Sequence, residues 1–279
     1  MRLLSPAQTQ KVAVATMWTL AAITIGILVF IIGYILVLGL PYVTWSFLTE
    51  APRQMGRGGG ILPMIVATIA VAGLAVLIAG PVGVATAVYL TEYTREGRLT
   101  AIIRFGADCL AGIPSIIFGL FGFVFFTITL GMGLSVISGA LTLALMVLPT
   151  IIRTAEVAIR AVPYSYREAS YGLGTTRWQM ITKVVLPSAL PGICTGVVLS
   201  VGRSISETAA VMLTAGSAPR MPESMFDSSR TLALHFYILS REGISMTNAY
   251  ATASVLIISI LLLNAIAYSI MNRFTRRVR

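Results

Sequence analysis

Five long runs without a charged residue constrain this chain more than any other feature of its sequence. No Asp, Glu, Lys or Arg occurs over residues 12–49, 58–91, 109–152, 184–202 and 243–272. A helix needs about 20 apolar residues to cross the hydrocarbon of a bilayer, and each run approaches or exceeds that length. Because lipid offers no partner for exposed backbone N–H and C=O groups, segments that cross it must be helical. The runs predict an all-α, polytopic membrane protein.

The third run is long enough for two crossings and is interrupted by Gly131-Met132-Gly133, which predicts a hairpin of two spans. We therefore expect one transmembrane domain over residues 1–279 with six spans: 16–40, 61–90, 109–130, 135–154, 187–213 and 249–271. The first uncharged run is much longer than the apolar core of a cleavable signal peptide, so we expect a retained span. Pro81 and Pro114 lie within spans and predict kinks or local breaks, which serve either a solute pathway or simple packing.

Composition and charge support a membrane location. Hydrophobic residues make up 57% of the chain and charged residues only 11%, too few to cover a water-soluble domain. The net charge of +10 comes from basic residues spread over the ends of spans, so we expect lipid and not nucleic acid as the partner. One side holds 13 basic residues: Arg2, Lys11, Arg95, Arg98, Arg104, Arg160, Arg167, Arg177, Lys183, Arg273, Arg276, Arg277 and Arg279. The other side holds 5, namely Arg53, Arg57, Arg220, Arg230 and Arg241. This asymmetry predicts that both termini are cytoplasmic.

Motifs for catalysis and cofactor binding are missing from the sequence. It contains no G-x-x-x-x-G-K-[ST] loop for a nucleotide, no H-E-x-x-H and no G-x-S-x-G. Cys109 and Cys194 have no second cysteine or histidine nearby, so neither suggests a metal site. We expect no catalytic residue, no metal and no cofactor bound by this chain itself.

Two connections on the expected outer side differ in character. Residues 50–60 are polar and glycine-rich, which predicts a flexible loop. The segment 214–248 contains an apolar run over 231–239, which predicts a short helix on the outer face where a soluble partner docks. We interpret His235 in this run as an ordinary interfacial side chain, because no carboxylate or second histidine accompanies it.

The connection 155–186, on the expected cytoplasmic side, predicts two short helices. Ser165 and Glu168 stand at capping-box spacing at the start of the first helix, and Gly172 and Gly174 are suited to end it. The second helix is expected over 176–185 and should stop before Pro187.

This connection resembles the E-A-A loop of ABC importer permeases, whose pattern is E-A-A, three residues, G, nine residues, I-x-L-P. Here Glu168-Ala169-Ser170 is followed at the same spacing by Gly174 and by Val184-Val185-Leu186-Pro187. Ser170 replaces the second alanine and Val184 replaces isoleucine. In that family the loop is a coupling helix that sits in a cleft of a cytoplasmic ATPase.

The resemblance implies the type I ABC importer permease fold and an ATPase dimer that binds ATP and Mg. It also implies that five residues act in coupling to that ATPase: Glu168, Ala169, Gly174, Leu186 and Pro187. Residues 80–93 are similar to the second span of permeases of the phosphate-specific importer. Residues 221–227 and 231–237 look like the outer loop of its PstA type rather than of its PstC type.

The narrower resemblance implies transport of inorganic phosphate across the inner membrane. It further implies a second permease of the PstC type and an extracytoplasmic phosphate-binding protein. Two alternatives stay open at this point. One is a permease for another oxyanion such as sulfate or molybdate, and the other is an ion-coupled secondary transporter.

Two pairs of opposite charges lie within or beside spans. Arg153 and Glu156 are three residues apart, and Arg203 and Glu207 are four apart, so each pair is predicted to share a helical face and form an ion pair. An ionisable residue inside the bilayer is a functional hypothesis by default. An arginine fork suits an oxyanion, and a nearby glutamate weakens anion binding enough for release. We interpret all four as residues of the substrate pathway, with helix-packing ion pairs as the structural alternative.

Overall fold

A computed structural model describes residues 6–94 and 97–278, which are almost entirely helical. Three basic residues used in the charge count, Arg2, Arg95 and Arg279, lie outside the described residues. The α-helices are α1 (Pro6–Gly39), α2 (Trp45–Thr49), α3 (Leu62–Val88), α4 (Arg98–Ala111), α5 (Ser115–Gly122), α6 (Val136–Arg160), α7 (Tyr164–Gly172), α8 (Arg177–Met180), α9 (Leu186–Ser206), α10 (Ala209–Thr214), α11 (Leu232–Arg241) and α12 (Met246–Val278). Short 3-10 turns are η1 (Leu40–Tyr42) and η2 (Gln54–Gly56), and π-helical segments are η3 (Tyr89–Tyr93), η4 (Phe123–Thr129) and η5 (Ile181–Val185). An antiparallel hairpin of β1 (Pro52–Arg53) and β2 (Gly58–Gly59) completes the described part.

Five helical segments are long and apolar enough to cross a membrane: Thr9–Tyr42, Leu62–Tyr93, Val136–Arg160, Arg177–Ser206 and Met246–Ser269. A sixth candidate is a broken one, formed by Arg98–Ala111 and Ser115–Thr129. The predicted all-α architecture with six spans is confirmed when this bent pair counts as one span.

The predicted third span, 109–130, has the wrong start and the wrong shape. The helical segment begins with α4 at Arg98, before the predicted start. The chain then bends by 101° between α4 and α5, which begins at Ser115. Pro114, which has no backbone N–H and disfavours helix in the residue before it, stands at this break. The expected local break at Pro114 is therefore confirmed, whereas Pro81 lies inside an uninterrupted α3.

The predicted fifth span, 187–213, also has different ends. Helix begins at Arg177, runs through η5 and Pro187, and ends at Ser206, so the expected stop before Pro187 is wrong. A proline has no N–H to donate to the normal helical hydrogen bond, and the π-helical segment just before it accommodates that loss with a wider turn. Residues 209–214 form the separate helix α10.

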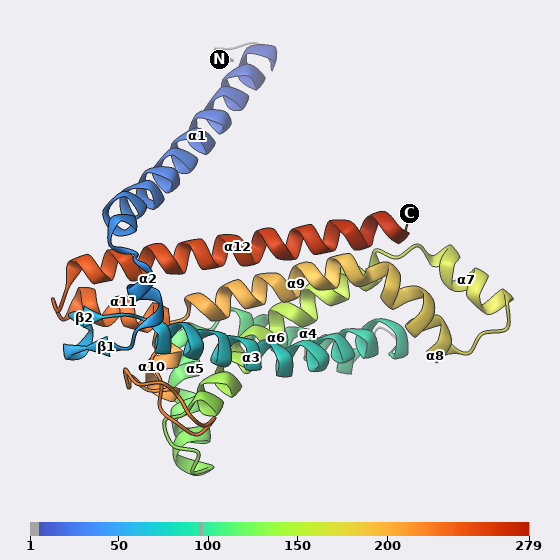
Figure 1. The fold of residues 1–279 in the computed structure, drawn as a ribbon. Helices are drawn as coiled ribbons and strands as arrows, with labels where there is room; N and C mark the ends of the chain where they lie inside the picture. Colours follow the sequence, from blue (N-terminus) through green and yellow to red (C-terminus); the bar gives the residue numbers. More distant parts are fainter. Residues whose placement is uncertain (1–5, 95–96, 279) are drawn as a thin grey trace.

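The core lies where α3, α6 and α9 run side by side, with α12 along one flank (Figure 1). Small residues allow close approach of these helices, as is usual for membrane bundles. Gly192 and Gly196 of α9, four residues apart, face Ala158 and Thr154 of α6 with no room for a side chain at either glycine. This contact fixes the last turns of α6 against α9.

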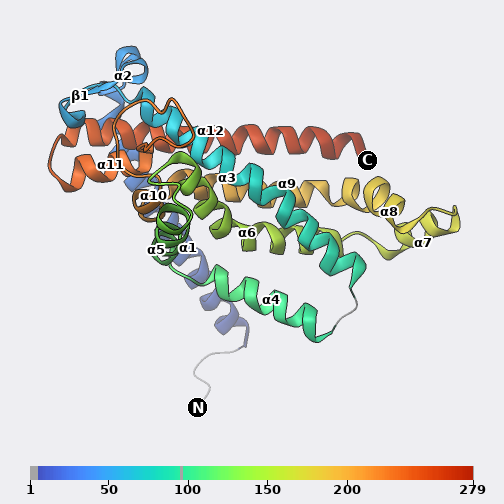
Figure 2. The ribbon, with the colours of Figure 1, turned by 90° about the horizontal axis from the view of Figure 1, so that it is seen from below.

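The two ends of the bundle carry different structures. The hairpin, α2 and α11 lie at one end, and α7 and α8 lie at the other, beside the C-terminal end of α12 (Figures 1 and 2). Helix α1 leaves the hairpin end and diverges from the bundle (Figure 1). It touches α12 through its last turns, where the Ser254 hydroxyl donates to the carbonyl of Ile35 at 3.2 Å. The rest of its apolar surface is exposed, as expected for a helix in contact with lipid or protein.

At the hairpin end, one prediction about His235 is wrong. The side chain is buried in α11 and not interfacial, with Gly56 of the hairpin close to its ring. The Arg230 guanidinium donates to His235 Nδ1 at 3.3 Å and to the carbonyl of Ser217 at 2.9 Å. Because arginine only donates, Nδ1 is the accepting nitrogen of a neutral imidazole. Burial, with the nearby Arg230 charge, lowers the pKa of His235 to about 4.

Candidate functional site

Five charged side chains from α4 and α6 gather near the end of the bundle that carries α7. They are Arg104, Asp108, Arg153, Glu156 and Arg160, which we call the α4–α6 cluster. The three members on α6 follow one another at helical spacings of three and four residues and so share one face. The two on α4 are four residues apart and meet that face.

Glu156 is the buried centre of the α4–α6 cluster. One carboxylate oxygen lies 2.7 Å from Arg104 Nε and 3.1 Å from Arg160 Nη2, and the other lies 3.3 Å from Arg153 Nη1. A buried carboxylate costs several kcal/mol of solvation unless such partners compensate it, so these contacts hold α4 against α6. The predicted ion pair between Arg153 and Glu156 is present. Its part in a substrate pathway stays a prediction.

Arg153 has a second partner, Asp108, on the more open side of the α4–α6 cluster. Its Nε donates to one Asp108 oxygen at 2.8 Å, and its Nη2 pairs with the other oxygen. The Arg153 side chain is 37% exposed and that of Asp108 is 54% exposed. A two-armed contact of a guanidinium with a carboxylate has the geometry with which arginine also binds the oxygens of a phosphate.

Charge balance in the cluster favours a weak, exchangeable anion contact. Three arginines face two carboxylates, which leaves one positive charge in excess. Glu156 is buried and fixed, whereas Asp108 is half exposed and holds its arginine from the open side. An anion that reaches Arg153 can therefore replace the Asp108 carboxylate without leaving an arginine unpaired.

Sequence reasoning missed Arg104 and Asp108. Spacing within one helix reveals the pair of Arg153 with Glu156, but it cannot show that α4, about 50 residues earlier in the chain, packs against it. The available signal was that Arg104 and Asp108 stand at helical spacing directly before an uncharged run.

The predicted ion pair between Arg203 and Glu207 is wrong. Helix α9 ends at Ser206, and Glu207 continues with an extended ψ of 130°, so the two residues do not share one helical face. Among the described residues, no ion pair joins them. Arg203 is exposed in the last turn of α9 and Glu207 is half-buried.

The connection between α6 and α9 forms the two predicted short helices, with different caps. Residue Pro163 precedes α7 and no side chain caps it, so the proposed capping box of Ser165 and Glu168 is wrong. The capping box lies at α8, where Thr176 and Gln179 bond to each other's backbone N–H groups. The helix end predicted at Gly172 is confirmed.

The turn between α7 and α8 depends on Gly174 and Ser170. Gly174 has a φ of +76°, a left-handed conformation that favours glycine. The Ser170 side chain, which stands where the E-A-A pattern has alanine, is buried, and its hydroxyl lies 2.7 Å from that of Thr175. Thr175 also donates to the Ser170 carbonyl at 2.9 Å. The serine thus adds a side-chain bond that closes this turn.

The surface that α7 and α8 leave exposed carries apolar residues. Glu168 and Ala169 are exposed, and Leu173 and Trp178 are 85% and 64% exposed. Exposed apolar residues grouped on a water-facing segment indicate a protein contact. The remaining predicted coupling residues, Leu186 and Pro187, open α9 directly after η5.

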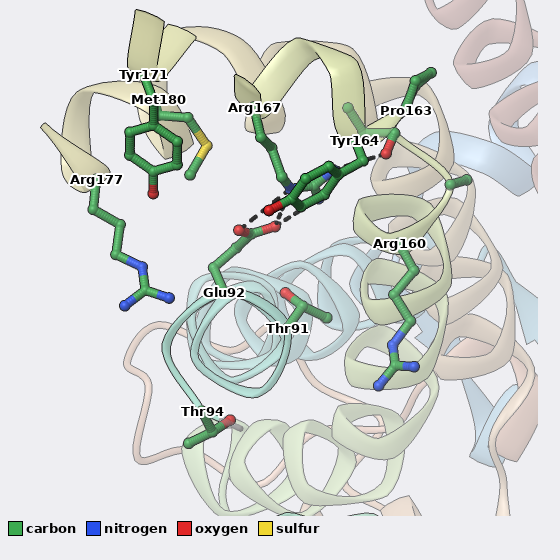
Figure 3. Close-up of a pocket in the computed structure, with 12 residues that line it drawn as sticks. Thr91, Glu92, Thr94, Arg160, Pro163, Tyr164, Arg167, Tyr171, Arg177 and Met180 are labelled. Atoms are coloured by element: carbon green, nitrogen blue, oxygen red, sulfur yellow. Dashed lines mark hydrogen bonds and ion pairs between the residues drawn. The ribbon is translucent and has the colours of Figure 1, made fainter. Parts of the chain in front are cut away.

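A cavity of about 540 Å³ lies between α7, α8 and the end of η3 (Figure 3). Glu92, at the end of the second span, points into it and pairs with Arg167 of α7 at 2.6 Å. Arg177 of α8 lies over the ring of the neighbouring Tyr93, 5.1 Å from its centre. Sequence reasoning did not place Glu92 or Arg167 in a functional site, although Glu92 directly follows an uncharged run.

Comparison with known proteins shows the family of this chain. Residues 79–279 match the family described as the binding-protein-dependent transport system inner membrane component. This chain belongs to that family. Over 276 residues it is 35% identical to the probable ABC transporter permease protein YqgI of Bacillus subtilis, covering 93% of this chain and 94% of that protein.

A second curated protein and a solved structure are also similar to this chain. The chain is 36% identical over 239 residues to the phosphate transport system permease protein PstA 1 of Mycobacterium tuberculosis, covering 85% of this chain and 77% of that protein. A solved structure of the MetNI methionine ABC transporter in an inward-facing conformation matches with a TM-score of 0.64 and 22% identity, covering 76% of this chain and 95% of that one. The latter likeness shows the type I ABC importer permease fold.

Family membership makes this chain an ABC importer permease of the inner membrane, with several membrane-spanning helices. Such a permease works with an ATPase and with a substrate-binding protein. The alternative of an ion-coupled secondary transporter is thereby excluded.

Proposed function

We propose that this permease forms the pathway for inorganic phosphate, as the narrower resemblance implies. The two-armed contact of Arg153 with Asp108 carries this proposal, because it places a phosphate-shaped donor fork on a partly exposed helix face. The similarity to a phosphate transport permease of Mycobacterium tuberculosis supports the choice of phosphate among oxyanions.

In this proposal the α4–α6 cluster handles the anion by exchange. A phosphate oxygen pair displaces the Asp108 carboxylate from Arg153, and Asp108 takes its place back when the anion leaves. Glu156 keeps Arg153 oriented from the buried side and lowers the net positive charge. The anion is thus held weakly enough to move on, as transport requires. Arg203, exposed in the last turn of α9, is proposed as a separate contact on the same pathway.

The assembly that we propose has a second permease of the PstC type, an ATPase dimer and an extracytoplasmic phosphate-binding protein. Two ATPase subunits need two coupling loops, and this chain offers one. ATP and Mg are bound by the ATPase, and this chain carries no cofactor or nucleotide site of its own. The excess of basic residues on the α7 side favours an orientation with both termini in the cytoplasm.

Labelled phosphate uptake by the complete complex in vesicles, with excess sulfate or molybdate as competitor, tests the substrate. Phosphate uptake that persists under an excess of either competitor supports phosphate, and loss of that uptake under an excess of either one contradicts it. Arg153→Gln should abolish uptake, and Arg153→Lys should restore part of it, because an ammonium keeps the charge but loses the planar fork. Arg98→Gln, at an exposed arginine that begins α4, is the matched control and should transport normally.

A further inference from the structure

Arg167 of α7 uses its whole guanidinium to join three segments of the chain. Its Nη2 and Nε lie 2.6 and 3.2 Å from Glu92 Oε1, at the end of the second span. Nη1 donates to the carbonyl of Val162 at 2.7 Å, and Nη2 donates to that of Ile159 at 3.1 Å. These carbonyls belong to the last turn of α6 and the residues after it. One side chain therefore ties η3, α6 and α7 together.

The ion pair of Glu92 with Arg167 is well shielded from water. The two side chains are 7% and 12% exposed, so solvent and salt screen their attraction much less than that of a surface pair. In Figure 3, Arg160 and Arg177 point away from this pair, towards opposite sides of the cavity. Glu92 and Arg167 meet across the cavity.

Helix α7 buries little surface of its own, although it also contacts η5. Ser170 is its only buried residue, and its bonds go to Thr175 in the following turn. The apolar cluster at this end packs α8, η5 and α9 against α3 and α6, with Met180, Ile181 and Val185 at its centre, and includes no residue of α7. The pair of Arg167 with Glu92 therefore links α7 directly to the second span, beside the indirect path through η5.

The end of the second span has a local structure that is typical of functional positions. Tyr89–Tyr93 is π-helical, and π-helical turns inside longer helices are rare and frequently occur at functional positions. The second segment of the coupling connection also contacts this end, because Arg177 of α8 stacks over Tyr93. Two adjacent residues thus contact the two short helices: Glu92 pairs with Arg167 of α7, and the ring of Tyr93 lies under Arg177 of α8.

We propose that Glu92 is a positioning residue for coupling, which links the movement of α7 on the ATPase to the second span through its ion pair with Arg167. The inference rests on membership in the permease family and holds whichever solute is carried. Because coupling between two sites is reciprocal in free energy, the same link passes the effect of the binding protein back to the ATPase.

The test is ATP hydrolysis by the complete complex in lipid vesicles, measured with and without the substrate-loaded binding protein. In Glu92→Gln we expect the ATPase to co-purify and the basal rate to stay near that of the unmodified complex. The stimulation by the binding protein should fall by about tenfold, within the usual range for a coupling free energy. Glu92→Asp keeps the charge on a shorter side chain and should retain part of the stimulation.

Arg167→Lys should lose stimulation to a similar degree as Glu92→Gln, because an ammonium cannot reach Glu92 and both carbonyls at once. The matched control is Arg98→Gln, which removes an exposed charge at the start of α4 and should leave the stimulation unchanged. Two outcomes overturn the proposal. One is normal stimulation in Glu92→Gln, and the other is loss of the ATPase from both Glu92 variants, which indicates that the pair only maintains the fold. The readout needs no assumption about phosphate, so the identity of the solute is tested separately by uptake.

Discussion

The Asp108 carboxylate occupies both arms of the Arg153 guanidinium, with Nε 2.8 Å from Oδ1 and Nη2 against Oδ2. This contact joins two helices that are distant in sequence, and it fills the positions that two oxygens of an oxyanion would take. Behind it, Glu156 is buried and pairs with three arginines, so its carboxylate is fixed in place. The arrangement separates a fixed counter-charge from an exchangeable one.

Asp108→Asn should raise the affinity of the complex for free phosphate. The amide keeps the shape of the side chain but loses its charge, so it competes less well for the Arg153 fork. We expect about tenfold tighter binding and slower uptake, because one charge-assisted hydrogen bond contributes on the order of 1.5–3 kcal/mol and the site is partly exposed to solvent. Equilibrium binding of labelled phosphate to the complex without its binding protein measures this. Unchanged affinity would show that Asp108 is only a helix-packing partner.

Gly174→Val should uncouple transport through the backbone alone. At a φ of +76° a β-branched residue is strained by about 1–2 kcal/mol, and no atom lies within 4 Å of a Cβ added here, so the backbone conformation and not a clash at Cβ is the cause. The variant should insert in the membrane but lose most ATP-dependent uptake. Gly174→Asn is the control, since asparagine tolerates this conformation, and it should transport nearly normally. Equal losses in both variants would contradict the argument from backbone strain.

The sequence predicted the spans well because lipid imposes one simple rule on them, a run of apolar residues of a minimum length. It failed at helix α4, which begins at Arg98 and carries Arg104 and Asp108. Those charges face α6 and pair there, so a count of charge-free residues placed the start of the span after them. The sharp turn at Pro114 was expected as a break, but its angle depends on what α5 packs against.

The site was predictable only within single helices. Arg153 with Glu156 follows from helical spacing, whereas Arg104 with Glu156 and Glu92 with Arg167 depend on tertiary packing. Helical spacing also misled for Arg203 and Glu207, because α9 ends between them at Ser206 with no glycine or proline in the interval to signal it. A pair rule is valid only if the helix continues through both residues.

Acidification should lower the stability of the segment at the hairpin end that contains α11. His235 has a pKa of about 4 in the folded protein because of burial, against about 6.5 when unfolded. Well above pH 6.5 the imidazole is neutral in both states and has no effect on stability. As the pH falls from 6.5 to 4, the unfolded state binds a proton that the folded state does not, so stability decreases, by at most about 3 kcal/mol.

Hydrogen exchange of α11 between pH 7.5 and pH 4.5 measures this effect, after correction for the intrinsic exchange rate. Protection in the unmodified protein should fall with pH, and in His235→Gln the fall should be smaller, because glutamine accepts from Arg230 without titrating. The same pH dependence in both proteins would assign the change to other groups.

Arg203 and Glu207 give a prediction that separates a pathway residue from a packing pair. The two side chains form no ion pair here, so removing one does not leave the other as an uncompensated partner. If Arg203 meets the anion, Arg203→Gln should nearly abolish uptake while the protein inserts and recruits the ATPase, and Arg203→Lys should recover only part of it. The effects of Arg203→Gln and Glu207→Gln should then be independent, and the double variant should be as inactive as Arg203→Gln alone.

Uptake is compared at matched membrane abundance, with Arg98→Gln as the control. Recovery of uptake in the double variant would show that the two charges pair in another state of the transport cycle and that Arg203 does not contact the anion.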